Sequence, residues 1–133
     1  MPLRSYRDLV VWQRSMELTE ELYALCARMP RYETLGIAGQ IRRAATSIPA
    51  NIAEGYGREY RADYVKHLSI AQGSLAELET LVMLSVRIGH VEPPMVLRAC
   101  ALSDEVGRML TAMLKRLGSR RPLTPSRSVG PRP

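Results

Sequence analysis

Phenylalanine is absent from this chain of 133 residues and tryptophan occurs once, so large aromatic side chains add little to any core. Strands are usually rich in β-branched and aromatic residues, whereas the apolar residues here are mainly aliphatic and include seven methionines. The composition therefore favours helices over strands. Hydrophobic residues make up 46% and charged residues 24% of the chain, which predicts one globular domain with a packed core.

Long apolar runs are missing as well. No stretch approaches the roughly 20 apolar residues that span a bilayer. The chain opens with polar and charged residues such as Arg4, Ser5 and Asp8, where a signal peptide would have an apolar segment. We therefore expect a protein that stays in the cytoplasm and has no contact with a membrane.

Cysteine and histidine are too sparse to indicate a reactive site. Cys26 and Cys100 lie far apart and form no C-x-x-C pair, so we interpret them as buried thiols. His67 and His90 are the two histidines, and neither belongs to a Glu-x-x-His motif or an evident pairing with a serine or cysteine. A phosphate-binding glycine loop is also lacking. We expect no enzymatic activity, no metal site and no cofactor.

Lysine is scarce too: of the 19 basic residues, only Lys66 and Lys115 are lysines and the rest are arginines. Arginine is well suited to phosphate recognition. The net charge of +6 is unevenly placed. Residues 119–133 contain four prolines, four arginines and no acid, which predicts a disordered basic tail. The rest of the chain has 15 basic against 13 acidic residues. We divide the sequence into a basic lead (1–7), a helical domain (8–118) and this tail.

Apolar residues recur at helical spacing in four segments. The first segment ends at Pro30, and its predicted apolar face is Leu9, Trp12, Met16, Thr19, Leu22, Cys26 and Met29. The second begins near Glu33 and ends at Gly55 and Gly57, and its predicted apolar face is Ile37, Ile41, Ala45, Ile48 and Ile52. Pro49 interrupts the hydrogen bond to the Ala45 carbonyl, but the apolar face keeps its phase. We therefore predict one kinked, continuous helix.

The third helix is predicted from about Glu59 to Ile88, where apolar residues alternate at steps of four and three. Gly73 and Ser74 lie in its middle and are interpreted as residues that let a neighbouring helix approach. Pro93 and Pro94 fit the first turn of a fourth helix, which ends at Gly118. Four rods of about 30 to 45 Å joined by short loops predict an all-α, antiparallel, up-down-up-down four-helix bundle.

A polar stripe runs along the second helix beside the isoleucine face. At 100° per residue its members fall on one side of the helix; they are Gln40, Arg43, Ser47, Asn51, Glu54 and Arg58. One interpretation is a structural seam in which Gln40, Arg43, Ser47, Asn51 and Glu54 form a satisfied hydrogen-bond network between helices or subunits. The other is a surface that meets a ligand. Both interpretations stay open at the level of sequence.

Three blocks of the chain resemble a known family. They are Asp8-Leu-Val-Val-Trp12-Gln13, then Gln40-Ile-Arg-Arg43-Ala-Ala-x-Ser47-Ile-Pro-Ala-Asn51-Ile-Ala-Glu54-Gly55, then Ile70-Ala-x-Gly73-Ser74-x-x-Glu77. In this order and spacing, over about residues 6–117, the chain resembles the four-helix bundle proteins named for the 23S rRNA intervening sequence. The accessory variability determinant of diversity-generating retroelements is related to that family.

The resemblance implies a four-helix protomer that assembles into a ring-like homopentamer. For the retroelement relatives it also implies a basic surface that binds nucleic acid and a partner reverse transcriptase. Many members of the family have no established activity, so the resemblance says more about fold than about function.

Two functions compete for this chain. The first is a non-enzymatic scaffold that binds RNA or DNA with little sequence preference, through Arg42, Arg43, Arg58, Arg61, Lys66, Arg120 and Arg121. The second is an adaptor for a reverse transcriptase or another protein partner, in which the positive charge is incidental. Tyr56, Tyr60 and Tyr64 are candidate contacts for either partner, although we favour core packing as their role.

Overall fold

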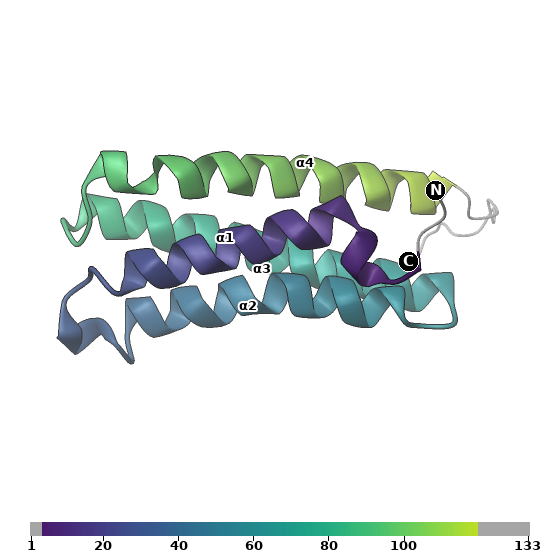
Figure 1. Ribbon diagram of the computed structural model, residues 1–133, viewed down its shortest axis with the longest axis horizontal. Helices are drawn as coiled ribbons and strands as arrows, with labels where there is room; N and C mark the ends of the chain where they lie inside the picture. The colour runs from purple at the N-terminus through teal and green to yellow at the C-terminus, as the bar shows by residue number, and fades with distance from the viewer. Residues whose placement is uncertain (1–3, 120–133) are drawn as a thin grey trace, which may run out of the picture.

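Four long antiparallel helices make up the computed structural model, which describes residues 4–119. They are α1 (Val10–Cys26), α2 (Ile37–Tyr56), α3 (Arg61–Arg87) and α4 (Leu97–Ser119). Short 3-10 turns precede three of them, namely η1 (Tyr6–Asp8), η2 (Arg31–Glu33) and η3 (Pro93–Val96). Successive helices run in opposite directions (Figure 1), which confirms the predicted up-down-up-down order. The tail predicted to be disordered, residues 119–133, lies outside the described residues except for Ser119, the last residue of α4.

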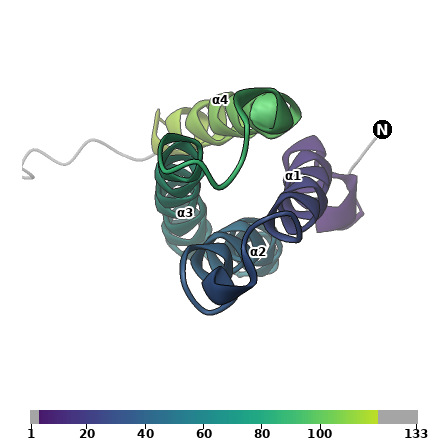
Figure 2. The same ribbon diagram turned by 90° about the vertical axis from the view of Figure 1, so that its left-hand side faces the viewer.

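Each helix packs against two neighbours around a common core. In the view along the bundle (Figure 2), α2 and α4 each lie between α1 and α3. The core is aliphatic, as the composition predicts, and all five residues of the predicted α2 face are buried: Ile37, Ile41, Ala45, Ile48 and Ile52. None of the helices within residues 4–119 is both long and apolar enough to cross a membrane.

The apolar face predicted for the first segment is confirmed at Leu22, Cys26 and Met29, which are buried, but it is wrong at Met16. Met16 is 37% exposed, whereas Ser15 is completely buried. The buried face of the helix consists of Val11, Ser15, Leu18, Leu22, Leu25 and Cys26. Ser15 fits this core because its hydroxyl donates to the Trp12 carbonyl 2.8 Å away on the same helix, so burial leaves no polar atom unpaired.

The connection between α1 and α2 also differs from the prediction. Helix α1 ends at Cys26, before Pro30. Past this point an amide bonds to the carbonyl three residues earlier, as the Arg28 amide does to the Leu25 carbonyl, and this tighter 3-10 pattern ends the α-helix. Helix α2 starts at Ile37 and not near Glu33. Glu33 instead caps α2, since its Oε1 accepts from the Ile37 amide at 3.0 Å.

Helix α2 continues through Pro49, and a residue of α1 offsets the lost hydrogen bond. Proline has no amide hydrogen, so the buried Ala45 carbonyl lacks its donor within the helix. The Thr19 hydroxyl lies 3.1 Å from this carbonyl and 2.8 Å from the Ser15 carbonyl, so it shares one hydrogen between them. Thr19 therefore gives the proline a partner in the neighbouring helix.

A second polar contact joins η2 to the end of α3. Helix α3 ends at Arg87 and is followed by Gly89, whose backbone is in the left-handed region (φ 82°). The His90 amide then donates to the Ser85 carbonyl at 2.9 Å. This turn places His90 Nε2 2.8 Å from Glu33 Oε2, with the side chains 10% and 21% exposed. Two hydrogen bonds hold the pKa of Glu33 below its usual value: the bond to His90 has the larger effect, and the bond from the Ile37 amide has the smaller.

Replacing Thr19 by valine tests the role of its hydroxyl. Thr19→Val leaves the Ala45 carbonyl unpaired in the core, so we expect it to lower the free energy of unfolding by about 1 to 3 kcal/mol. In a Pro49→Ala background the new amide can donate to Ala45, so most of this cost should vanish. Urea denaturation of the unchanged protein, the two single variants and the double variant measures the cost of Thr19→Val in each background. The same cost for Thr19→Val in both backgrounds would contradict the assignment.

Glu33→Gln tests the contact with His90. Folding lowers the pKa of the Glu33 carboxyl, so the ionised carboxylate stabilises the folded protein. This stabilisation is complete at pH values above the pKa of glutamate in the unfolded chain, about 4.3. It is lost as the pH falls through the lower pKa of the folded protein. Glu33→Gln should therefore lower Tm at pH 7, and the difference should shrink below about pH 4. Thermal melts at both pH values measure it. Glu20→Gln, on the exposed face of α1, is the matched control.

Candidate functional site

The polar stripe of α2 divides into three parts, and its middle part lies against α3. Asn51 Nδ2 donates to the carbonyl and hydroxyl oxygens of Ser47, at 2.9 and 3.0 Å. The Ser74 hydroxyl of α3 lies 2.9 Å from the Ser47 hydroxyl, and Nδ1 of His67 lies 2.9 Å from Asn51 Oδ1. Ser47, Asn51, His67 and Ser74 thus form one hydrogen-bonded seam between α2 and α3.

The seam also fixes the state of the His67 ring. Because Asn51 directs its NH₂ group at the Ser47 carbonyl, which can only accept, its own oxygen faces His67. The Nδ1 atom of His67 must therefore hold a hydrogen and donate it. His67, for which the sequence shows no motif or partner, is thus a member of the seam.

Close approach of the two backbones accompanies this seam. A Cβ atom placed on Gly55 would lie 2.7 Å from Cβ of His67 and 3.1 Å from Cδ1 of Tyr64, so only glycine fits there. The prediction that Gly73 allows a close approach is wrong, because a Cβ on Gly73 would meet no atom within 4 Å. Ser74, its neighbour, does contact α2 through Ser47.

The outer members of the stripe are exposed. Gln40 and Arg43 line an open hollow of about 400 Å³ between α2 and α3, together with Ser74 and Glu77. At the other extreme, Arg58 Nη2 pairs with Glu54 Oε2 at 2.6 Å on the surface. The stripe is therefore a structural seam at its centre and a solvated surface at both ends.

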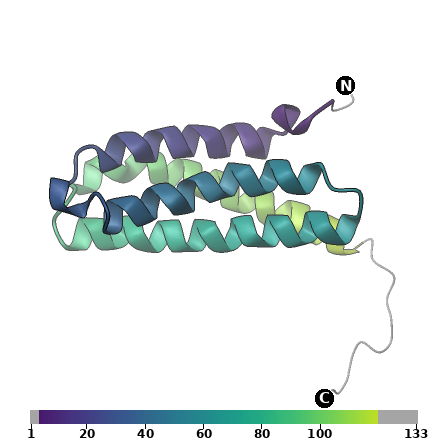
Figure 3. The ribbon, with the colours of Figure 1, turned by 90° about the horizontal axis from the view of Figure 1, so that it is seen from below.

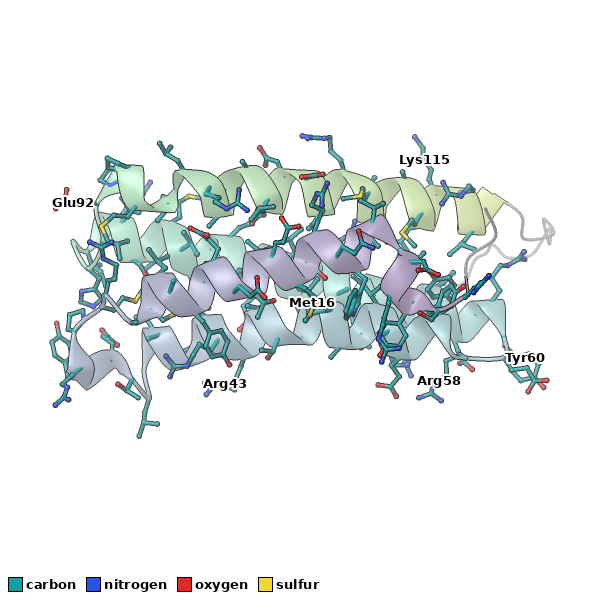
Figure 4. All side chains as sticks on the ribbon, viewed as in Figure 1. Met16, Arg43, Arg58, Tyr60, Glu92 and Lys115 are labelled. Atoms are coloured by element: carbon teal, nitrogen blue, oxygen red, sulfur yellow. The ribbon has the colours of Figure 1, made fainter. Side chains whose placement is uncertain are left out.

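The residues proposed to contact nucleic acid are separated by the structure. Arg58, Arg61 and Lys66 lie around the connection between α2 and α3. Arg42 and Arg43 lie in the first half of α2, away from this connection, as the labels of Arg43 and Arg58 show (Figure 4). Arg42 also has a structural contact, since its Nη2 donates to the Thr34 carbonyl at 2.8 Å. Arg120 and Arg121 lie outside the described residues.

The antiparallel topology adds further cations to the first group. The start of α1 and the last turns of α4 lie at the same end of the bundle as the α2–α3 connection (Figure 3). Its basic residues are Arg4, Arg7, Arg58, Arg61, Lys66, Lys115 and Arg116, and its acidic residues are Asp8, Glu54, Glu59 and Asp63. We call this region the basic end. Arg4, Arg7, Lys115 and Arg116 were not among the predicted contacts, although the predicted up-down-up-down topology already places them at this end.

The middle of the bundle has the opposite balance. Its acidic residues are Glu17, Glu20, Glu21, Glu77, Glu79, Asp104 and Glu105, and its basic residues are Arg14, Arg42, Arg43, Arg98 and Arg108. Arg14 bonds Glu105 at 2.9 Å and Glu17 at 3.2 Å, while Arg98 lies 3.4 Å from Glu21. The positive charge of the described chain is therefore concentrated away from its middle.

Aromatic residues accompany the cations of the basic end. Tyr56 and Tyr64 pack edge to face with their ring centres 6.0 Å apart, and burial raises the pKa of Tyr64. Tyr60, in contrast, is 66% exposed. On η1, the Arg7 guanidinium lies 5.1 Å from the ring centre of Tyr6. Of the three tyrosines proposed as contacts, two pack together and one projects into solvent.

A different kind of hollow lies between α3 and α4. It has a volume of about 580 Å³ and is lined mainly by apolar side chains, including Val82, Val86 and Val96. Burial and the nearby Asp104 raise the pKa of Glu79 at its edge. Among residues 4–119, no three or more histidine, cysteine or acidic side chains are arranged to hold a metal ion.

Comparison with known proteins gives a family and similar solved structures. Residues 7–112 match the family described as 23S rRNA-intervening sequence protein. The fold is similar to the crystal structure of a protein of unknown function from the S23 ribosomal protein family of Bacteroides thetaiotaomicron, with a TM-score of 0.71 and 26% sequence identity. That match covers 79% of this chain and 98% of the other. No curated protein matches the chain.

Two glycine-to-alanine variants test the close approach of α2 and α3. Gly55→Ala places a methyl group against His67, so we expect it to lower the free energy of unfolding by about 2 kcal/mol or more. Gly73→Ala adds a methyl group in open space in mid-helix and should stabilise the protein by about 0.5 to 1 kcal/mol. Urea denaturation measures both. Equal effects of the two substitutions would contradict the packing described here.

Proposed function

The chain belongs to the 23S rRNA-intervening sequence protein family, and from this starting point we propose that it is a non-enzymatic scaffold that binds RNA or DNA through its basic end. The observation that supports this proposal is the distribution of charge. Seven basic residues meet four acidic ones at that end, whereas acidic residues predominate in the middle of the bundle. Phosphate groups are the natural partners of such a surface.

The sequence beyond the described helices extends the same charge. Helix α4 ends at Ser119, at the basic end, and residues 120–133 add Arg120, Arg121, Arg127 and Arg132 without an acidic residue. Arginine binds phosphate oxygens through two parallel hydrogen bonds, which makes it well suited to a nucleic-acid backbone. Contacts to phosphate do not involve the base edges, so we expect binding with little sequence preference.

Assembly would multiply these contacts. The ring-like homopentamer that the resemblance implies would bring together about 20 arginines from residues 120–133 alone. Weak single contacts would then add up to a high overall affinity. We include this pentamer in the proposed function, and light scattering would report it as a particle of about 75 kDa, five times the 14.9 kDa chain.

A protein adaptor is the second candidate, and one observation favours it. Large apolar side chains are exposed around the end of the bundle opposite the basic end; they include Tyr32, Leu35, Met83, Ile88 and Leu97. Exposed apolar groups that lie close together are typical of protein contacts. A partner such as a reverse transcriptase would then bind at one end while nucleic acid binds at the other, so the two functions are compatible.

Two triple variants with equal charge changes test the proposed function. The first, Arg58→Gln, Lys66→Gln and Lys115→Gln, removes three cations from the basic end. The second, Arg28→Gln, Arg31→Gln and Arg87→Gln, removes three exposed cations from the opposite end. Fluorescence anisotropy with a structured RNA and a duplex DNA, at 50 and 200 mM salt, measures the affinity. We expect the first variant to bind about tenfold or more weakly, with a salt slope smaller by roughly two to three.

The second variant should bind almost as tightly as the unchanged protein. Removal of residues 120–133 separates the contribution of the tail from that of the bundle. If the unchanged protein binds neither nucleic acid at 50 mM salt, the proposed function is wrong. If both triple variants lose the same affinity, the binding surface is not the basic end.

A further inference from the structure

Tyr60 occupies a position that neither the core nor helix capping explains. It lies in the short connection between α2 and α3, immediately before α3 begins, and its side chain is 66% exposed. Residues at this position usually cap the helix with a side-chain oxygen, yet Tyr60 makes no such bond. A large aromatic ring is thus held in water without a structural role among the described residues.

The surroundings of Tyr60 are ordered by hydrogen bonds. The Gly57 amide donates to the Ala53 carbonyl at 3.3 Å, and the Arg58 amide donates to the Gly55 carbonyl at 3.1 Å. On the other side, the Asp63 and Tyr64 amides both donate to the carbonyl of Tyr60. The exposed ring is therefore attached to a backbone that is fixed on both sides.

Cations lie on both sides of the ring along the chain. Arg61 follows Tyr60 directly, Arg58 precedes it by two residues with Glu59 between them, and Lys66 follows on the second turn of α3. The side view shows Tyr60 beyond the last turns of the helices, at the end that also holds Arg58 and Lys115 (Figure 4). An exposed aromatic ring among cations is the combination that binds single strands, where bases stack on rings and phosphates contact basic groups.

We infer that Tyr60 stacks on an unpaired base, so that the basic end prefers single-stranded nucleic acid to a duplex. This inference rests on the proposed function and narrows its ligand. In a duplex the faces of the bases are covered by their neighbours, and a tyrosine on the protein surface reaches only the backbone. An unpaired base in a loop, bulge or single strand offers its face to the ring of Tyr60.

The test compares one exposed tyrosine with another. Tyr60→Ala removes the ring at the basic end, Tyr60→Phe keeps it, and Tyr32→Ala removes a ring that is 78% exposed at the opposite end. Fluorescence anisotropy with a 20-nucleotide oligouridine, the matching oligothymidine and a blunt RNA duplex of the same length measures binding at 50 mM salt. Circular dichroism confirms that each variant is folded.

We expect Tyr60→Ala to bind both single strands roughly 5- to 150-fold more weakly, the range measured for loss of one stacking aromatic residue. Its affinity for the duplex should change less than twofold, and its salt slope should stay the same, because no cation is lost. Tyr60→Phe and Tyr32→Ala should bind all three ligands as the unchanged protein does. A preference for oligouridine over oligothymidine would identify RNA as the ligand.

Two results would overturn the inference. If Tyr60→Ala leaves single-strand binding unchanged, or weakens single-strand and duplex binding equally, Tyr60 does not stack on a base, while the proposed function stands. If the unchanged protein binds none of the three ligands, both the inference and the proposed function fail.

Discussion

The close contact between α2 and α3 is the constraint on which the candidate site depends. Gly55 lets the two backbones approach, and Ser47, Asn51, His67 and Ser74 hydrogen-bond across the contact. The polar side chains fix the register of the two helices, because a shift of either helix would leave several of these groups without partners. The connection that follows the contact, with Arg58, Tyr60 and Arg61, takes its position at the end of the bundle from this register.

The separation of charge follows from the topology and not from any one helix. An even number of antiparallel helices brings the start of α1, the α2–α3 connection and the last turns of α4 together, and each contributes basic residues. Ion pairs such as Arg14 with Glu105 neutralise basic residues in the middle. The slightly positive net charge of the bundle thus hides one end that is clearly basic and a middle that is acidic.

The sequence predicts much of the fold because the strongest signals are repeated. The five apolar residues of α2 keep one phase over 16 residues, and all are buried. Met16 was wrongly placed on the buried face of α1, because the core position beside it is occupied by a polar residue, Ser15, which bonds its own helix. Gly73 was misjudged because its environment depends on packing. The role of His67 could not be predicted, since the rotation of α3 that brings its ring to Asn51 has no signature within a single helix.

Both ends of the described chain lie at the basic end of the bundle, with Arg4 before α1 and Ser119 at the end of α4 (Figure 3). A fluorescent protein or surface linker attached directly at Arg4 or at Ser119 is thereby placed at the basic end, where it would hinder the approach of a large ligand. The connections at the opposite end, around Tyr32 and Pro93, are exposed and are better sites for a label. Immobilisation through that end would leave the basic surface facing the solution.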